Sequence, residues 1–153
     1  MTAELTLTVD VDAPAEVVWE VVTDYERAPM FTRDLQVSRI LGRNGDTVRV
    51  LQKAQVRYGP LAVTDTMVIT EWEPPTRCVV HHTGAVIRGD GIFEVTALGP
   101  QRARFLWSEL LDLPFGVVGR VGWPIARPLL RVGVARSLRA MARHCETRYR
   151  DRG

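Results

Sequence analysis

The hydrophobic pattern of this chain changes its period once, and that change limits the folds open to it. From Asp34 onward, apolar and polar residues alternate as in half-buried strands, with short turn sequences between the runs. After residues 113–116 the period becomes helical. From Leu129 to Tyr149, six side chains recur at steps of three or four and share one helix face: Leu130, Val134, Leu138, Met141, Cys145 and Tyr149. Pro124 and Pro128 predict a bent or irregular approach to this helix. The sequence therefore predicts an antiparallel sheet followed by a long helix with one apolar side.

Turn sequences set the expected number of strands. Breaks rich in glycine, proline and asparagine occur at residues 43–46, 58–60, 73–76 and 98–101. The Asn44-Gly45 pair is the sharpest, because a type I′ turn needs positive φ at both central positions. These four breaks, with the glycine-containing segment 88–91 that also lies between strand segments, indicate a six-stranded meander from Asp34 onward. The two glycines of that segment are expected to allow close backbone approach or a bulge. A further strand is predicted at residues 4–11, which gives seven strands in all.

Two short helices are expected between the first strand and the meander. Asp12 and Pro14 form a helix start, with a capping residue followed by proline near the first turn, leading into residues 15–23. Residues 25–31, which contain Pro29, predict a second short helix or turn. The expected class is therefore α+β.

Size and composition predict one domain over residues 1–153. The chain has 46% apolar and 25% charged residues, ordinary values for a globular protein that can bury a core unaided. No window approaches the roughly 20 apolar residues of a membrane span, and the N-terminus lacks a signal-peptide pattern. We expect a cytoplasmic protein without stable membrane insertion, metal or cofactor. Cys78 and Cys145 are interpreted as free structural thiols.

The basic residues gather near the C-terminus. Residues 113–153 hold nine arginines against Glu146 and Asp151, which suggests nucleic acid or anionic lipid as one option. However, Arg136, Arg139 and Arg143 fall opposite the apolar helix face, and no aromatic residues interleave with them as nucleic-acid stacking requires. We interpret them as the solvated back of the helix and expect no nucleic-acid binding. A protein-interaction surface is the third functional alternative.

Three sequence pieces carry a family resemblance: residues 13–19, Asp24 with Pro29, and Trp107-Ser108-Glu109 running into residues 113–116. The chain resembles the SRPBCC family, the polyketide cyclase/dehydrase and lipid-transport branch of the START/Bet v 1-like superfamily. The resemblance implies a helix-grip fold, in which a seven-stranded curved sheet surrounds the C-terminal helix and encloses a ligand cavity. Family members include lipid carriers, hormone and flavonoid binders, aromatase/cyclases and stress proteins.

Cross-strand pairing predicts which side chains face the cavity, because directly opposite residues share a face. Four registers follow from the turns: Arg43 opposite Asp46, Val56 opposite Leu61, Trp72 opposite Arg77 and Val95 opposite Ala103. They place a small polar set on the concave face: Arg39, Gln52, Asp65, His82, Glu109 and, nearer the edge, Glu71. His81 is expected to point outward. The apolar candidates for ligand contact are Met67, Phe93, Phe105, Trp107 and Trp123, with Tyr25 and Phe31 facing Trp123 across a possible opening. Core packing explains the apolar set equally well.

Two functions are compatible with this face. The first is binding or carriage of a hydrophobic small molecule such as a lipid, polyketide or isoprenoid. The second is a cyclase or dehydratase, with His82 and either Asp65 or Glu109 transferring protons and Arg39 holding an enolate or carboxylate. The polar residues also fit a structural network that satisfies buried charge, which we favour over catalysis.

Overall fold

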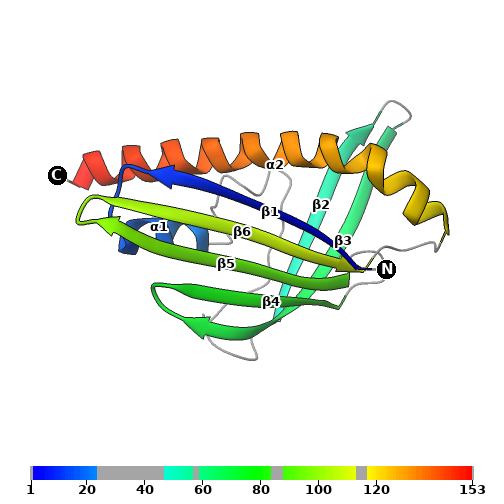
Figure 1. Cartoon of the computed structure of the whole chain (residues 1–153), viewed down its shortest axis with the longest axis horizontal. Helices are drawn as coiled ribbons and strands as arrows, with labels where there is room; N and C mark the ends of the chain where they lie inside the picture. Colours follow the sequence, from blue (N-terminus) through cyan, green and yellow to red (C-terminus); the bar gives the residue numbers. More distant parts are fainter. Residues whose placement is uncertain (1, 24–46, 57–58, 84–87, 113–116, 153) are drawn as a thin grey trace.

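The computed structural model describes residues 2–23, 47–56, 59–83, 88–112 and 117–152. Its strands are β1 (Thr2–Val11), β2 (Thr47–Val56), β3 (Gly59–Glu73), β4 (Arg77–Thr83), β5 (Arg88–Gly99) and β6 (Arg102–Asp112), and its helices are α1 (Ala15–Thr23) and α2 (Val117–Arg152). The strands form one antiparallel sheet in the order β1-β6-β5-β4-β3-β2. α2 runs along the sheet, and α1 lies beside its C-terminal part (Figure 1).

The described residues correct the expected number of elements. They form six strands and one short helix after β1, where seven strands and two short helices were predicted. The predicted strand from Asp34 to Arg43 and the predicted helix at residues 25–31 fall within residues 24–46, outside the described part of the chain. The helix-grip arrangement itself, a curved antiparallel sheet with a long C-terminal helix, is confirmed.

One face of the sheet forms the core because alternate residues point to it. The fully buried members of this face include Val11, Ile69, Val80, Val95 and Phe105. Leu138, Met141, Ala142 and Cys145 of α2 and the valines of α1 belong to the same buried cluster. The sheet therefore has one apolar side, and the two helices cover part of it.

The start of α1 follows from local sequence. The Pro14 carbonyl accepts hydrogen bonds from the backbone N–H groups of Val17 and Val18, so the helix begins directly after the proline, as the sequence predicted. Trp19 packs against Trp72 of β3, with ring centroids 5.2 Å apart. Glu20 accepts a hydrogen bond from Arg152 at 2.6 Å, which joins the outer side of α1 to the end of α2.

The C-terminal helix is longer than the period predicted. Periodicity indicated a helix over residues 129–149 with a bent approach, whereas α2 begins at Val117 and contains both Pro124 and Pro128. A proline removes one backbone hydrogen bond inside a helix, which is costly where the freed carbonyl is buried. Here both prolines are exposed, so water can satisfy the carbonyls that they leave unpaired.

Two predicted registers are shifted by two residues. Val56 pairs with Gly59 and not Leu61, and Val95 pairs with Phe105 and not Ala103. Fewer residues than predicted lie between Val56 and its partner, and more lie between Val95 and its partner. Because the side-chain period of a strand is two, a register shift of two residues leaves every side chain on its predicted face. The faces inferred from alternation therefore stand although the direct partners differ.

A bulge between Ile69 and Glu71 overturns the prediction for Glu71. Met67 pairs with His82 as predicted, but beyond the bulge Trp72 pairs with Cys78 and not with Arg77. The extra residue turns Trp72 to the core face and Glu71 to the outer face. Glu71 there accepts a hydrogen bond from the Arg77 guanidinium at 2.8 Å, so it is not a cavity residue.

The buried end of α2 gives the fold a sensitivity to alkaline pH. Both cysteines are buried and free, as expected. Burial, with a smaller contribution from the Glu146 carboxylate, raises the pKa of the Cys145 thiol from 9.0 to about 12. Between these values the folded chain keeps a proton that the unfolded chain has released, so the free energy of unfolding falls as pH rises.

We predict that Cys145→Ala removes this component of the alkaline destabilisation. The wild type should lose up to about 1.4 kcal/mol more stability per pH unit above pH ~9 than the variant. Urea unfolding of both proteins between pH ~8 and ~10.5 measures the difference. The two curves should run parallel below pH ~8, and equal slopes above pH ~9 would contradict the prediction.

Candidate functional site

Two predicted polar residues meet on the concave face. His82 of β4 and Glu109 of β6 reach toward each other across β5, and His82 Nε2 lies 3.1 Å from Glu109 Oε2. The imidazole N–H donates to the carboxylate, since a carboxylate can only accept. The side chains are 5% and 12% exposed, so this is a buried polar contact in an apolar sheet face. Removing one partner of such a buried contact lowers the stability of the fold.

Gly91 makes this contact possible. Gly91 of β5 lies opposite Glu109 on one side and Val80 on the other. A Cβ at this position would lie 3.0 Å from Glu109 Oε1, 3.0 Å from Val80 Cγ2 and 3.3 Å from His82 Nε2. Because Gly91 has no side chain, it leaves the space in which the side chains of His82 and Glu109 meet.

Gly89 brings β5 and β6 together beside the pair. Its φ is +118°, and a Cβ there would lie 1.8 Å from the Leu110 carbonyl oxygen. Only glycine fits this backbone and this distance. The glycines at the start of β5 thus serve close backbone approach, as the sequence suggested, and they adjoin His82, which pairs with Gly89.

The other residues predicted for the site lie in different parts of the structure. Phe93 and Phe105 are buried core residues with ring centroids 5.8 Å apart, and Trp107 is partly buried beside them. Trp123 lies half-buried inside α2, not in a loop before it. For Gln52, Asp65 and Met67 the strand register is known: they pair with Val63, Val50 and His82. Arg39, Tyr25 and Phe31 lie outside the described residues.

His81 is a natural contrast to His82. It lies one residue earlier on β4 and therefore on the opposite face of the sheet. Its Nδ1 lies 2.7 Å from Asp90 Oδ1, and both side chains are about half exposed. The outward orientation predicted for His81 is confirmed, so two adjacent histidines have unrelated environments.

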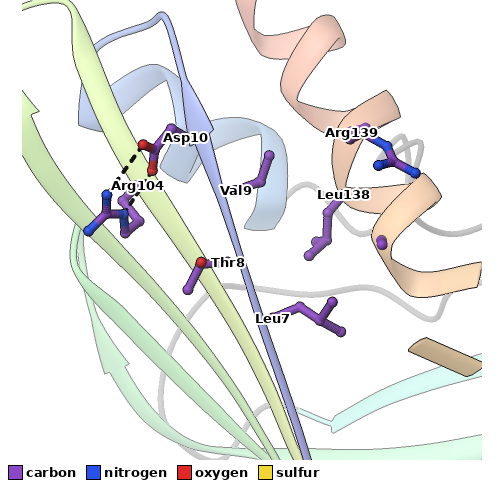
Figure 2. A pocket seen from close by; sticks show the side chains of 8 residues that line it. Leu7, Thr8, Val9, Asp10, Arg104, Leu138 and Arg139 are labelled. Atoms are coloured by element: carbon purple, nitrogen blue, oxygen red, sulfur yellow. Dashed lines mark hydrogen bonds and ion pairs between the residues drawn. The ribbon is translucent and has the colours of Figure 1, made fainter. Parts of the chain in front are cut away.

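A groove of about 450 Å³ lies between β1 and α2. Figure 2 shows Leu7 and Val9 of β1 and Leu138 of α2 bordering the space from the two sides, with Arg139 at the helix. Ala135 completes the helical wall, and Thr8, Asp10 and Arg104 form the outer rim. The lining of the groove is therefore mixed: aliphatic side chains lie between β1 and α2, and polar and charged groups make up slightly more than half of the lining.

The rim carries a fixed charge pair. Arg104 Nε donates to Asp10 Oδ1 at 2.8 Å, and Arg102 approaches the same carboxylate at 3.3 Å. The hydrogen bond from Arg104, followed by the attraction of both guanidinium groups, lowers the pKa of Asp10 below its ordinary value. Asp10 therefore stays ionised across neutral pH, and Arg139 is the rim cation drawn on the helix side.

The groove and the buried pair share two strands. Leu7 in the groove pairs with Trp107, and the next inward pair along these strands is Leu5 with Glu109. Two residues of extended chain span about 7 Å. The buried side chain of Leu5 thus lies between the groove and the His82–Glu109 contact.

Sequence reasoning missed the groove and the role of Gly91. The alternation of β1 identified Leu7 as inward-facing, but the partners Ala135 and Arg139 depend on how α2 sits on the sheet. In the described residues, no group of three or more His, Cys, Asp or Glu side chains is placed to hold a metal ion. No helix in this part of the chain is long and apolar enough to cross a membrane.

Solved structures share this architecture. A START superfamily protein from Mycobacterium smegmatis matches with a TM-score of 0.64 at 17% identity, covering 98% of this chain and 99% of that one. The Zhui aromatase/cyclase from Streptomyces sp. R1128 matches at 0.67 and 20% identity, covering 97% and 96%. A conserved protein from Geobacillus kaustophilus matches at 0.71 and 10% identity, covering 96% of both chains. At these identities the likeness shows the fold alone.

Sequence comparison identifies the family. None of the curated proteins matches the chain in sequence. The family described as "Polyketide cyclase / dehydrase and lipid transport" matches residues 2–146, which is nearly the whole chain. With the curved sheet, the long C-terminal helix and the START-superfamily likeness, this match shows that the chain belongs to the polyketide cyclase/dehydrase and lipid-transport family of the SRPBCC group.

Proposed function

We propose that the protein binds a hydrophobic small molecule between α2 and the concave face of the sheet. One observation carries the proposal: a groove of about 450 Å³ between β1 and α2, beside which the aliphatic side of β1 runs on to the strand position opposite Glu109 of a buried hydrogen-bonded pair. Small-molecule sites typically enclose about 300–1,000 Å³ and combine an apolar lining with a few fixed polar groups. Both features are present here on adjoining positions.

The arrangement favours a ligand with a long apolar body and a sparse set of oxygens. Leu7, Val9 and Leu138 offer apolar contact, and the charged rim keeps ionic groups at the outer edge. The His82–Glu109 pair offers one polar contact to a carbonyl or hydroxyl deeper on the face. Lipids, polyketides and isoprenoids have this chemistry. A role for Arg39, Gln52, Asp65 or Met67 in the same site stays a prediction, as do a single domain over residues 1–153 and a cytoplasmic location.

Filling the groove should weaken ligand binding. Native mass spectrometry of the gently purified wild type is expected to show an apolar small molecule that denaturation releases. Ala135→Trp places an indole in the groove and should lower the affinity for that molecule, or for an apolar fluorescent probe, at least about tenfold.

The matched control is Ala126→Trp, which adds the same ring to an exposed position of α2 outside the groove. It should bind like the wild type. An empty wild-type protein that also ignores apolar probes, or equal binding by both tryptophan variants, would count against the proposal.

A second prediction concerns the space at Gly91. Gly91→Ala should force Glu109 and His82 to shift and so weaken both the buried contact and the ligand affinity, with a loss of roughly 1–3 kcal/mol in stability. The matched control is Gly99→Ala, because a Cβ at Gly99 meets nothing within 4 Å. It should change stability by less than about 0.5 kcal/mol.

Urea unfolding and probe titration measure both effects. Equal stability and equal affinity in the two alanine variants would mean that the His82–Glu109 contact does not depend on the space at Gly91. A loss of stability with unchanged affinity would mean that the pair is structural and lies outside the ligand site.

The His82–Glu109 hydrogen bond also favours a second candidate function, a cyclase or dehydratase. A carboxylate that holds an imidazole in one orientation stabilises the imidazolium formed when that ring takes a proton. A polyketide-like substrate in the groove would present a carbon acid beside a carbonyl, and His82 would remove its proton. Membership of a family that includes cyclases supports this candidate at the same level as it supports carriage.

His82→Ala and Glu109→Gln should separate the two functions. If the protein is an enzyme, each variant should lower turnover of a poly-β-ketone substrate by about 10²–10⁴-fold. His81→Ala is the matched control, since His81 is an adjacent histidine on the other face. A carrier would show no wild-type turnover above background, and unchanged turnover in His82→Ala would contradict the assignment of His82 as a base.

A further inference from the structure

The first half of α2 is exposed on all sides. Residues 120–133 are exposed throughout except Trp123, which is half-buried. The helix packs into the core only from Val134 onward, through side chains such as Leu138, Met141 and Cys145. In Figure 1 the start of α2 extends past the N-terminal start of β1, away from the body of the sheet.

Four apolar side chains line up on this exposed segment. Val121, Ile125, Leu129 and Val132 are 66%, 71%, 73% and 51% exposed, and we call them the outer stripe. At 3.6 residues per turn they fall within an arc of about 80°. That arc lies opposite the line of Leu138, Met141 and Cys145, so the outer stripe faces away from the sheet. Contiguous exposed apolar surface of this kind marks an interaction site.

The charge around the stripe is of one sign. Between Asp112 and Glu146 the sequence has six arginines and no acidic residue. Arg136 and Arg143 continue the same helical line that Ile125 begins, and both are exposed. The outward side of α2 is therefore apolar in its first half and cationic in its second.

We propose that the outer stripe docks the protein on an anionic membrane surface. A helix lying in the interface buries its apolar side chains among the lipid headgroups while nearby cations meet lipid phosphates. α2 provides both on one line, and docking in the plane needs no membrane-spanning segment. A hydrophobic ligand in the groove beside α2 would then be close to a lipid phase.

Charge complementarity favours a lipid surface over a second copy of the chain. Two copies packed through the outer stripe would bring two sets of arginines together without an acidic residue between residues 112 and 146 to offset them. Anionic headgroups attract the same side chains. Self-association is therefore the competing occupant that the experiment must exclude.

Vesicle sedimentation of the full chain tests the proposal. The wild type should bind phosphatidylcholine vesicles containing about 30% phosphatidylglycerol at low salt, bind pure phosphatidylcholine weakly, and release as salt rises. Ile125→Ser with Leu129→Ser should weaken binding at least about tenfold, because two exposed apolar anchors are lost. Arg136→Glu with Arg143→Glu should weaken it further at low salt.

Matched controls use exposed residues elsewhere. Leu98→Ser removes an exposed leucine near the end of β5, and Arg88→Glu reverses an exposed arginine at the start of β5. Neither should change vesicle binding. All variants should keep the binding of the apolar probe, which separates this test from the proposed ligand function.

Three results would overturn the proposal. One is no binding of the wild type to anionic vesicles, and another is equal loss in the stripe variants and their controls. The third is a wild-type dimer, seen by sedimentation velocity, that the stripe variants convert to a monomer without any effect of vesicles; the stripe would then be an interface between two copies.

Discussion

The packing of the second half of α2 on the concave sheet face is the contact on which the other features depend. Leu138, Met141 and Cys145 are fully buried, and they share one cluster with residues of α1 and of the strands. The apolar side of the sheet therefore faces this helix, and the outer side is left to polar residues. The helix also fixes α1, because Arg152 reaches Glu20 and the Asp12 backbone N–H donates to Glu146.

This contact also determines where a ligand can lie. At the end near Val11 and Ala103, α1 and α2 fill the concave face with fully buried side chains. Glu109 lies six residues from Ala103 along β6, or about 20 Å away. The buried polar pair is therefore placed well beyond the packed end, and the groove beside Leu7 and Leu138 lies between the two. Packing at one end and polar chemistry at the other is the division that a binding site for a long apolar molecule requires.

The buried pair has an energetic consequence for the sheet around it. Burying a carboxylate is unfavourable unless hydrogen bonds compensate, so the loss of one hydrogen-bond partner lowers stability. His82 and Glu109 come from strands that are not neighbours, so their contact crosses β5 and needs Gly91 there. A structural network would need the same glycine. Breaking the contact lowers stability whether the pair is structural or functional. Only a change in ligand affinity distinguishes a functional pair.

Much of the fold could be predicted because the side-chain period of a strand is two. Errors of two residues in the registers of Val56 and Val95 changed the direct partners but not the faces, so His82 and Glu109 were still placed together. Alternation cannot reveal a bulge, because one inserted residue is invisible until the partner strand is known. That is why Glu71 was assigned to the wrong face. The sequence indicated that another part of the chain comes close to the backbone at Gly91. It could not show which atoms do so, because they belong to two other strands.

The length of α2 was underestimated for a different reason, and the reason bears on its function. The helical period was recognised only along the face that packs on the sheet, and residues 120–133 do not pack there, so their own apolar line was not used as a helix signal. Pro124 and Pro128 then read as a break, although an exposed helix tolerates them. An isolated helical segment that packs on nothing gains little from tertiary contacts and is marginal in water. The apolar outer stripe therefore gives this segment a physical reason to meet a second surface, and the arginines that follow it on the same line determine which charge that surface should have.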